Sequence, residues 1–490
     1  MTAHITSRRR FMKAVGLGLL AGIAPRARAQ ASTAARRPNI VLIMADDMGY
    51  EAIACNGGTS YQTPMFDKLA AAGMRFTNCY SQPICTPSRV KIMTGRSNAR
   101  NYRDFGDLDP HEITFGHVMK AAGYKTCIAG KWQLCGGPAL TGSLPQSSGF
   151  DESCMWAYTN NIPEADRDKY TFFGTKPDKT SRYWNPAIVK NGAYVPTTTE
   201  DYGPDIYSGF ILDFIERNKT NEFFAYYPMT LTHGPFLATP HSTDRSVLTK
   251  TKSSPEFFDD MIQYAGFLVD RIVKKLNELG IAENTLVLFT CDNGTARGLV
   301  SQMGDRMVVG GKGLTIDAGV HVPLIAYWPG VTRPGSVCTD LVDFSDFMPT
   351  LAEIGKGELP TDRVLDGHSF LPQLKGEKGE PRQAVVVHYD KNPPEVKPAF
   401  RRVRCAYDGR YKLYLDGRMF DVPNDWIEVK PIPVDAMSDA QMAAREKLQA
   451  ALDLLPEWHP DNTSFQGEPD PEMKRYLAKY GVTVKIAIED

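Results

Sequence analysis

Apolar runs of strand length alternate with helix-like segments along the first three quarters of the chain. Residues 39–44 and residues 285–290 are continuous apolar runs, which are typical of parallel strands buried on both faces. Residues 64–72 follow a threonine and begin with proline, and residues 258–279 carry apolar side chains at helical spacing. This alternation predicts an α/β fold in which helices flank a large mixed or parallel sheet.

The pattern changes towards the C-terminus, where strands become shorter and polar positions more frequent. Residues 412–422 predict a β-hairpin with a turn at an Asp-Gly pair. Ser438 and Gln441 then have the spacing of a helix capping box. We therefore expect a catalytic domain over residues 38–375 and a smaller C-terminal α+β subdomain over residues 380–490.

The N-terminus has the pattern of a bacterial export signal. Residues 7–13 read Ser-Arg-Arg-Arg-Phe-Met-Lys, the twin-arginine pattern, and residues 14–24 form an apolar run too short to span a membrane permanently. Ala27-Arg28-Ala29 supplies the small residues of a cleavage site. Residues 1–29 are thus predicted to be a twin-arginine signal peptide, with the Tat translocase as a partner and a periplasmic or secreted location. The alternative is a disordered basic tail.

Charge and cysteine content argue against some classes of partner and site. The formal net charge of −1 gives no reason to propose a nucleic-acid partner, and removing the six basic residues of the signal leaves 50 − 57 = −7. The nine cysteines are an odd number without C-x-x-C spacing. Neither a zinc cluster nor a complete disulfide framework is therefore indicated, and one cysteine is left for another use.

Acidic residues follow both apolar runs. Asp46 and Asp47 come after the first, and Asp292 and Asn293 come after the second. Ligands of open α/β sheets gather beyond the carboxyl ends of the strands, so these four side chains meet if the two strands are neighbours. Their oxygen atoms suit Ca²⁺ or Mg²⁺ better than zinc. Either pair alone is better explained as a turn that ends a strand, and the joint occurrence weakens that explanation.

Cys85-Thr86-Pro87-Ser88-Arg89 predicts the start of a helix that ends before Gly95. Cys85 would lie at the positive end of this helix, where unpaired backbone N–H groups favour anions. Arg89, about one turn further on, could reach the same anion. On these grounds alone, Cys85 is either an activated nucleophile or simply part of a capped helix.

The C-x-P-S-R segment, after a strand ending in Asp-Asp and before Thr94-Gly95-Arg96, resembles the type I (formylglycine-dependent) sulfatase family of the alkaline phosphatase superfamily. Further blocks resemble this family in its own order: Gly130-Lys131-Trp132, Thr232-His233-Gly234-Pro235, Asn284-Thr285, Asp292-Asn293-Gly294, Gly311-Lys312-Gly313, Val322-Pro323-Leu324, Trp328-Pro329-Gly330 and residues 346–350. An alkaline phosphatase-like fold is implied.

The resemblance also implies a reaction. A formylglycine-generating enzyme would oxidise Cys85 to formylglycine, and the aldehyde would be hydrated to a diol. One hydroxyl attacks sulfur, and the other then loses its proton and expels sulfate. The metal, preferentially Ca²⁺ with Mg²⁺ as the alternative, would be held by a set of five residues: Asp46, Asp47, Cys85, Asp292 and Asn293.

By the same resemblance, Arg89, Lys131 and Lys312 would hold the sulfate, and His233 would lie near the leaving oxygen. Each has a plainer alternative: the lysines as solvated surface charges, the histidine as a structural residue. Gln133 departs from the family, which usually has histidine there. Glutamine can hydrogen-bond a diol or sulfate oxygen but cannot act as a base near neutral pH. Residues 317–321 also depart from the family pattern.

The expected substrate is a sulfated small molecule or glycan, with a carbohydrate sulfate preferred, and residues 151–202 are the candidate specificity loop. A phosphate or phosphonate ester hydrolase of the same superfamily is the nearest rival, because the same groups suit any tetrahedral oxyanion. A non-catalytic binder of sulfated glycans is the rival from another class, and Gln133 is the reason to consider it.

Overall fold

The computed structural model describes residues 36–136, 141–157, 163–167, 182–391, 402–458 and 478. The predicted export signal, part of the predicted specificity loop and the end of the predicted C-terminal subdomain lie outside these residues. Among the described residues, no helix combines the length and the apolarity that crossing a bilayer requires.

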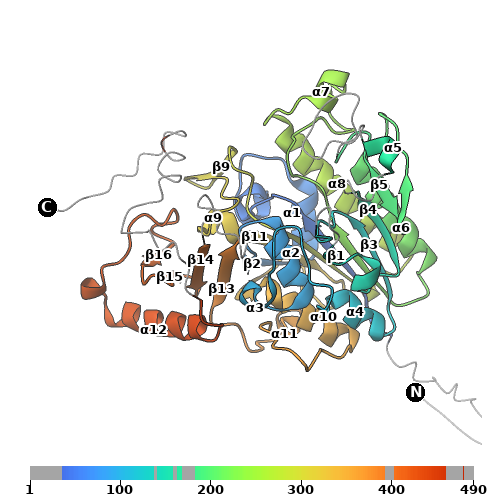
Figure 1. Ribbon diagram of the computed structural model, residues 1–490. Helices are drawn as coiled ribbons and strands as arrows, with labels where there is room; N and C mark the ends of the chain where they lie inside the picture. The colour runs from blue at the N-terminus through green and yellow to red at the C-terminus, as the bar shows by residue number, and fades with distance from the viewer. Residues whose placement is uncertain are drawn as a thin grey trace, which may run out of the picture. The chain divides into compact units, whose positions relative to one another are not determined.

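A ten-stranded mixed sheet forms the centre of the molecule (Figure 1), as the pattern of apolar runs predicted. Its strands, in spatial order, are β12 (Ser336–Asp343), β2 (Met74–Tyr80), β11 (His321–Tyr327), β8 (Thr285–Cys291), β1 (Asn39–Ala45), β7 (Phe223–Pro228), β3 (Lys125–Gly130), β4 (Glu152–Trp156), β5 (Ile188–Lys190) and β6 (Ala193–Val195). Strands β8, β1, β7, β3 and β4 run parallel to one another, whereas β11 runs antiparallel between β2 and β8.

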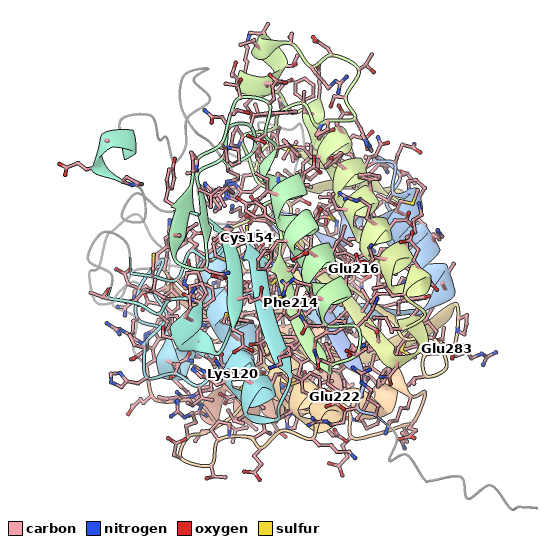
Figure 2. All side chains as sticks on the ribbon, turned by 90° about the vertical axis from the view of Figure 1, so that its right-hand side faces the viewer. Lys120, Cys154, Phe214, Glu216, Glu222 and Glu283 are labelled. Carbon is pink, nitrogen blue, oxygen red and sulfur yellow. The ribbon has the colours of Figure 1, made fainter. Side chains whose placement is uncertain are left out.

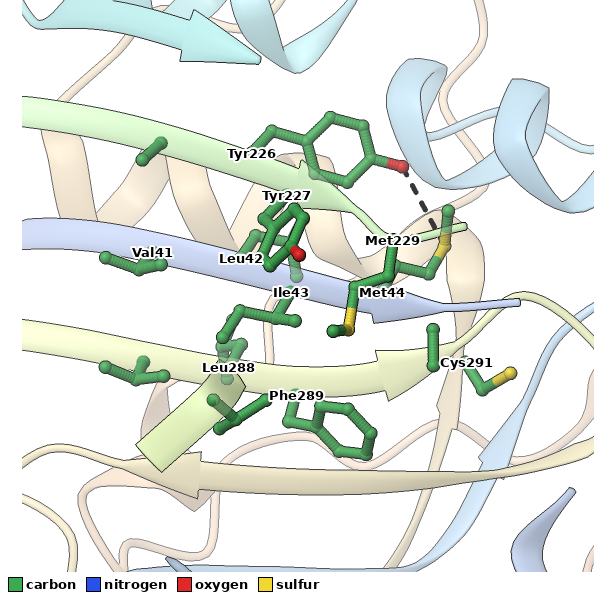
Figure 3. Close-up of a cluster of buried hydrophobic side chains, with 14 of the residues drawn as sticks. Val41, Leu42, Ile43, Met44, Tyr226, Tyr227, Met229, Leu288, Phe289 and Cys291 are labelled. Carbon is green, nitrogen blue, oxygen red and sulfur yellow. Dashed lines mark hydrogen bonds between the residues drawn. The ribbon is translucent and has the colours of Figure 1, made fainter. Parts of the chain in front are cut away.

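The two predicted apolar runs are neighbouring strands at the middle of this sheet. Every residue of β1 and β8 is buried. Figure 3 shows side chains of β1, among them Met44, between those of β7 and β8, with the Tyr226 hydroxyl 3.8 Å from the Met44 sulfur. Continuous apolar runs arise here because both faces of these strands are covered by helices.

The helices form two layers on the sheet. One layer contains α1 (Pro64–Ala72), α6 (Gly203–Arg217) and α8 (Phe257–Glu278), and the other contains α2 (Cys85–Thr94), α4 (Phe115–Ala121) and α10 (Phe347–Gly355). Figure 2 shows α6, marked by Phe214 and Glu216, running along the sheet. The shorter elements are α3 (Asn98–Asn101), α5 (Glu164–Arg167), α7 (Val247–Thr251), α9 (Asp317–Val320), α11 (Leu371–Leu374), β9 (Val300–Met303) and β10 (Arg306–Val309).

A second, four-stranded antiparallel sheet follows. Its strands are β13 (Val385–Asp390), β14 (Arg402–Tyr407), β15 (Tyr411–Tyr414) and β16 (Met419–Asp421), and α12 (Asp439–Asp453) packs against β14 and β15. The predicted hairpin and the Ser438–Gln441 capping box are confirmed. Tyr80 of the large sheet packs with Val385 and Tyr407 of the small one. The domain boundaries at residues 375 and 380 stay predictions.

Candidate active site

Four oxygen-bearing side chains meet where β1 and β8 end. The two strands are parallel and in register up to Ala45 and Cys291, so the residues after them lie side by side. The Asp47 backbone N–H donates to Asp292 Oδ1 at 3.2 Å, and Asn293 Nδ2 donates to Asp47 Oδ1 at 2.8 Å. These side chains and Asp46 are fully buried. The condition on which the sequence-based metal site depended, that the two strands are neighbours, is met.

Three predicted cations contact these carboxylates. Arg89 Nη2 lies 2.7 Å from Asp292 Oδ2, and Lys131 Nζ lies 2.7 Å from Asp46 Oδ2. Lys312 Nζ lies 2.6 Å from Asp47 Oδ2. The plainer interpretation of the two lysines as solvated surface charges is therefore wrong, because both point into the acidic cluster.

The backbone explains how Lys131 and Lys312 reach the cluster. Gly130 has φ +123°, and a Cβ there would lie 2.0 Å from the Pro228 carbonyl oxygen, so only glycine lets β3 end so close to β7. Lys131 follows directly. Lys312 arrives from the other direction, since it precedes β11, whose N-terminal end faces the C-terminal ends of β1 and β8.

Cys85 is the first residue of α2 and is 3% exposed. Its Sγ lies 3.5 Å from Gln133 Oε1, and Gln133 has φ +53°. Every residue of α2 is buried, so the helix presents its N-terminus to the site and its remaining surface to the protein. The structure thus places Cys85 against Gln133 at the start of the helix that carries Arg89.

His233 lies on the same cluster, with Nε2 3.7 Å from Asp47 Oδ2. Its Nδ1 lies 2.6 Å from the Gly234 carbonyl oxygen, which can only accept, so Nδ1 carries the proton. Burial, together with the charges of Arg182 and Lys312, lowers the pKa of His233 to about 3. The imidazole is therefore neutral near pH 7, with an acceptor at Nε2.

Two buried oxygen atoms bear on whether a cation fits the site formed by Asp46, Asp47, Asp292 and Asn293. Asp46 Oδ1 and Asn293 Oδ1 have no hydrogen-bond partner in the described part of the chain. Such atoms are costly unless another group satisfies them. Burial, together with the charge of Asp46, raises the pKa of Asp292 to about 7. A divalent cation would bind the two unpaired oxygen atoms and would stabilise the ionised form of Asp292. The oxygen-only ligand set suits Ca²⁺ or Mg²⁺. Atoms of Asp46, Asp47 and His233 also lie close enough together to hold a metal.

Within residues 317–321, the side chains of Asp317 and His321 contact each other and not the acidic cluster, in the described part of the chain. His321 is stacked between Tyr50 and Tyr80, with ring centroids 4.0 and 4.8 Å away. Its ring nitrogens contact Asp317 Oδ2 at 3.2 Å and the Thr77 carbonyl oxygen at 2.8 Å. The departure from the family pattern is accommodated by packing on the sheet.

Sequence reasoning missed Arg182. Its Nη1 lies 3.3 Å from Asp46 Oδ2. The residue falls inside the predicted specificity loop, but nothing in the local sequence distinguishes it, because its approach to Asp46 depends on contacts across 136 positions.

A family model described as Sulfatase matches residues 38–357, about two thirds of the chain. The chain belongs to the sulfatase family. A second model, described as N-sulphoglucosamine sulphohydrolase, C-terminal, matches residues 311–453. This sulfatase is 33% identical over 400 residues to human arylsulfatase A, covering 78% of this chain and 75% of that protein. It is 30% identical over 403 residues to mouse N-acetylgalactosamine-6-sulfatase, covering 77% and 71%.

Solved structures share the fold. A protein in complex with its substrate D-glucosamine-2-N,6-O-disulfate superposes on this sulfatase with a TM-score of 0.68 at 21% identity, covering 88% of this chain and 100% of that one. The phosphonate monoester hydrolase of Agrobacterium radiobacter gives 0.63 at 20% identity, covering 86% and 95%. The alkaline phosphatase-like fold predicted from the motifs is thus confirmed.

Proposed function

We propose that this protein is a sulfuric ester hydrolase that cleaves a sulfate ester, with residue 85 as the nucleophile after conversion to formylglycine. One observation carries the proposal. Four oxygen-bearing side chains at the ends of β1 and β8 share a buried site with the N-terminus of α2, which bears the Cys-x-Pro-Ser-Arg motif. Family membership supplies the sulfate ester as the substrate class.

Asp46, Asp47, Asp292 and Asn293 would hold the cation, which we propose to be Ca²⁺, with Mg²⁺ as the alternative. When bound, such an ion neutralises sulfate oxygens and promotes ionisation of a hydroxyl at residue 85. Because Lys131 and Lys312 now neutralise Asp46 and Asp47, cation binding would free both ammonium groups for the sulfate. Arg89, fixed against Asp292, would hold the anion from the helix side.

Two neighbouring groups differ in what they can do with a proton. Neutral His233 presents an acceptor at Nε2 towards the cluster, so it can accept a hydrogen bond there, but its lowered pKa makes it a weak base. Gln133 touches residue 85 and can orient a hydroxyl through its amide, but it cannot remove a proton. We therefore assign Gln133 an orienting role, and any base that regenerates the aldehyde must be another group.

We further propose a sulfated carbohydrate as the substrate. The support is that one relative is named for N-acetylgalactosamine 6-sulfate and one structural neighbour was solved with a glucosamine disulfate. The proposal includes export through the Tat translocase to the periplasm or beyond, on the motif in residues 1–29, and a formylglycine-generating enzyme as partner, on the motif at Cys85.

The test begins with mass spectrometry of the peptide containing Cys85, from protein co-produced with a formylglycine-generating enzyme. A mass about 18 Da below unmodified cysteine indicates the aldehyde. Turnover of matched aryl sulfate and aryl phosphate by the same preparation then separates a sulfatase from a phosphohydrolase. Intact thiol without turnover, together with binding of sulfated glycan, would instead support the non-catalytic binder.

Removing divalent cations is expected to abolish turnover and to lower thermal stability. Ca²⁺ at 100 times its dissociation constant would stabilise the folded protein by about 2.7 kcal/mol, because it binds only the assembled site. Differential scanning fluorimetry during Ca²⁺ titration measures this. Asp292→Ala should abolish the Ca²⁺-dependent rise in Tm, while Asp213→Ala, at an exposed ion pair on α6, should leave it intact. Full turnover after exhaustive chelation would rule out a required cation.

A further inference from the structure

We propose that Arg182 is a substrate-contacting residue that stabilises negative charge on the leaving-group oxygen of the sulfate ester. This inference rests on the proposed function and adds to it a residue outside the family motifs. It predicts how strongly turnover depends on the leaving group, and therefore bears on the substrates that the enzyme can cleave.

The Arg182 side chain is built into the site and not left at its surface. It is 3% exposed, and its guanidinium carbon lies 4.4 Å from the centre of the Trp156 ring. Trp156 ends β4, at the same edge of the sheet as the ends of β1 and β8. Stacking on this ring fixes the plane of the guanidinium group.

Arg182 has donor capacity that the protein does not use. Its Nη1 contacts Asp46 Oδ2 at 3.3 Å, but its buried Nε has no hydrogen-bond partner among the described residues. A buried unpaired donor is unfavourable unless a ligand satisfies it. Asp46 does not require Arg182 as a counter-ion, since Lys131 contacts the same oxygen more closely, at 2.7 Å.

The charges of the cluster also leave room for an anion. Four cationic side chains (Arg89, Lys131, Arg182 and Lys312) contact three carboxylates (Asp46, Asp47 and Asp292), a balance of 4 − 3 = +1. A divalent cation would raise this to +3. A sulfate monoester brings one negative charge, and the attacking oxygen brings a second. A cation beyond the sulfate clamp is therefore available for the leaving oxygen.

The position of Arg182 favours this oxygen. The two arginines contact different oxygens of Asp46, because Arg89 lies 3.9 Å from Oδ1 whereas Arg182 lies 3.3 Å from Oδ2. The next residue, Tyr183, donates its hydroxyl hydrogen bond to the carbonyl oxygens of Thr230, at 2.8 Å, and of His233. Arg182 is thus tied through Tyr183 to the segment that carries His233, and it contacts a different oxygen of Asp46 from Arg89.

Cleavage of the ester bond creates negative charge that a cation at the position of Arg182 would stabilise. As the nucleophile at residue 85 forms its bond to sulfur, the bond between sulfur and the bridging oxygen breaks and its electron pair stays on that oxygen. The oxygen is negative until it takes a proton. An alkoxide from a sugar holds this charge less well than a nitrophenolate, so a fixed guanidinium matters more for carbohydrate sulfates.

The test compares wild-type enzyme with Arg182→Gln and Arg182→Lys on aryl sulfates of graded leaving-group pKa and on one sugar sulfate. Arg182→Gln is expected to lower kcat/KM by about 10-fold for nitrophenyl sulfate and by about 100- to 1000-fold for the sugar sulfate. The plot of log kcat/KM against leaving-group pKa becomes steeper. The kcat/KM values of Arg182→Lys, which keeps the charge, are expected to lie between those of wild type and those of Arg182→Gln.

Calorimetry of inorganic sulfate binding to the Ca²⁺-loaded proteins gives a readout independent of turnover. Arg182→Gln should weaken binding about 10-fold, because one charge-assisted hydrogen bond is lost. Arg217→Gln is the matched control, since Arg217 also pairs with carboxylates and lies 5.9 Å from an aromatic ring, but at the exposed far end of α6.

Equal losses for all leaving groups, with unchanged sulfate binding, would overturn the role of Arg182. Absence of turnover by the modified wild-type enzyme would count against the proposed function instead, and the sulfate titration would still decide whether Arg182 binds the anion.

Discussion

Replacing Cys85 with alanine is expected to reduce sulfate ester turnover by about 10⁶-fold, the scale seen when an enzyme loses its nucleophile. Alanine keeps the helix start but offers no atom that can be oxidised or attack sulfur. The loss should appear in kcat, whereas substrate binding should persist because Arg89, Lys131 and Lys312 remain. Initial rates with an aryl sulfate and calorimetry with the intact sulfate ester measure the two effects separately.

Cys338→Ser is the control for this variant, because Cys338 is half-buried on β12, away from the acidic cluster. It should retain nearly full activity. Activity of Cys85→Ala within about tenfold of wild type would show that residue 85 is not the nucleophile. Retained binding without turnover would also provide a stable complex for identifying the carbohydrate.

Lys91→Met is expected to destabilise the folded protein by about 3–5 kcal/mol without touching the reacting atoms. Lys91 lies on α2, and its Nζ contacts Asp343 Oδ2 at 2.7 Å and the Val386 carbonyl oxygen at 2.8 Å. Both charged side chains are buried. Methionine would fill the space but leave the Asp343 carboxylate without this partner. Urea unfolding of wild type and variant measures the loss.

The stability difference between wild type and Lys91→Met is expected to depend on pH. Burial raises the pKa of Asp343, but Lys91 and then Arg382 outweigh it and hold that pKa below its usual value. The stability that this ion pair contributes is therefore present above the unfolded pKa of about 3.9 and is lost as pH falls through the folded pKa. In Lys91→Met the carboxyl pKa rises, so the difference from wild type should be largest near pH 7 and shrink towards acid pH.

Lys274→Met is the control for Lys91→Met, because it removes an exposed ion pair with the same N–O distance as the buried pair of Lys91 and Asp343. Lys274 lies 2.7 Å from Asp270 but is 61% exposed. Solvent screening limits such a pair to about 0–1 kcal/mol. The double variant Lys91→Met/Asp343→Leu should recover part of the loss, because no buried charge is then left unpaired. Similar losses for the buried and the exposed lysine would contradict this account.

The sequence was most informative where local pattern and function coincide. The apolar runs before Asp46 and Asp292 predicted two strands. The rule that ligands gather at their carboxyl ends predicted convergence on the condition that the strands are neighbours, and in the structure they are. The start of α2 at Cys85 and its end before Gly95 were likewise predictable, because the signals for both lie within the length of that helix.

Long-range geometry was not predictable in the same way. The placement of β11 antiparallel between β2 and β8 depends on which strands pair, and no local periodicity encodes pairing. Arg182 and His233 meet Asp46 and Asp47 only through the folded sheet. The same holds for His321, whose role became clear only from the two tyrosine rings that enclose it.

The burial of α2 also bears on how the protein is made. Lys91 and its partner Asp343 are 252 positions apart, so a ribosome working at about 5–20 residues per second needs about 10–50 s to supply the residue that holds this helix in place. Under the proposed function, a modifying enzyme would have to reach Cys85 within this interval. Adding that enzyme only to folded, unmodified protein should leave the thiol mass unchanged, and an aldehyde there would contradict this expectation. Because twin-arginine export carries folded chains, the competition between translation and oxidation would be decided in the cytoplasm.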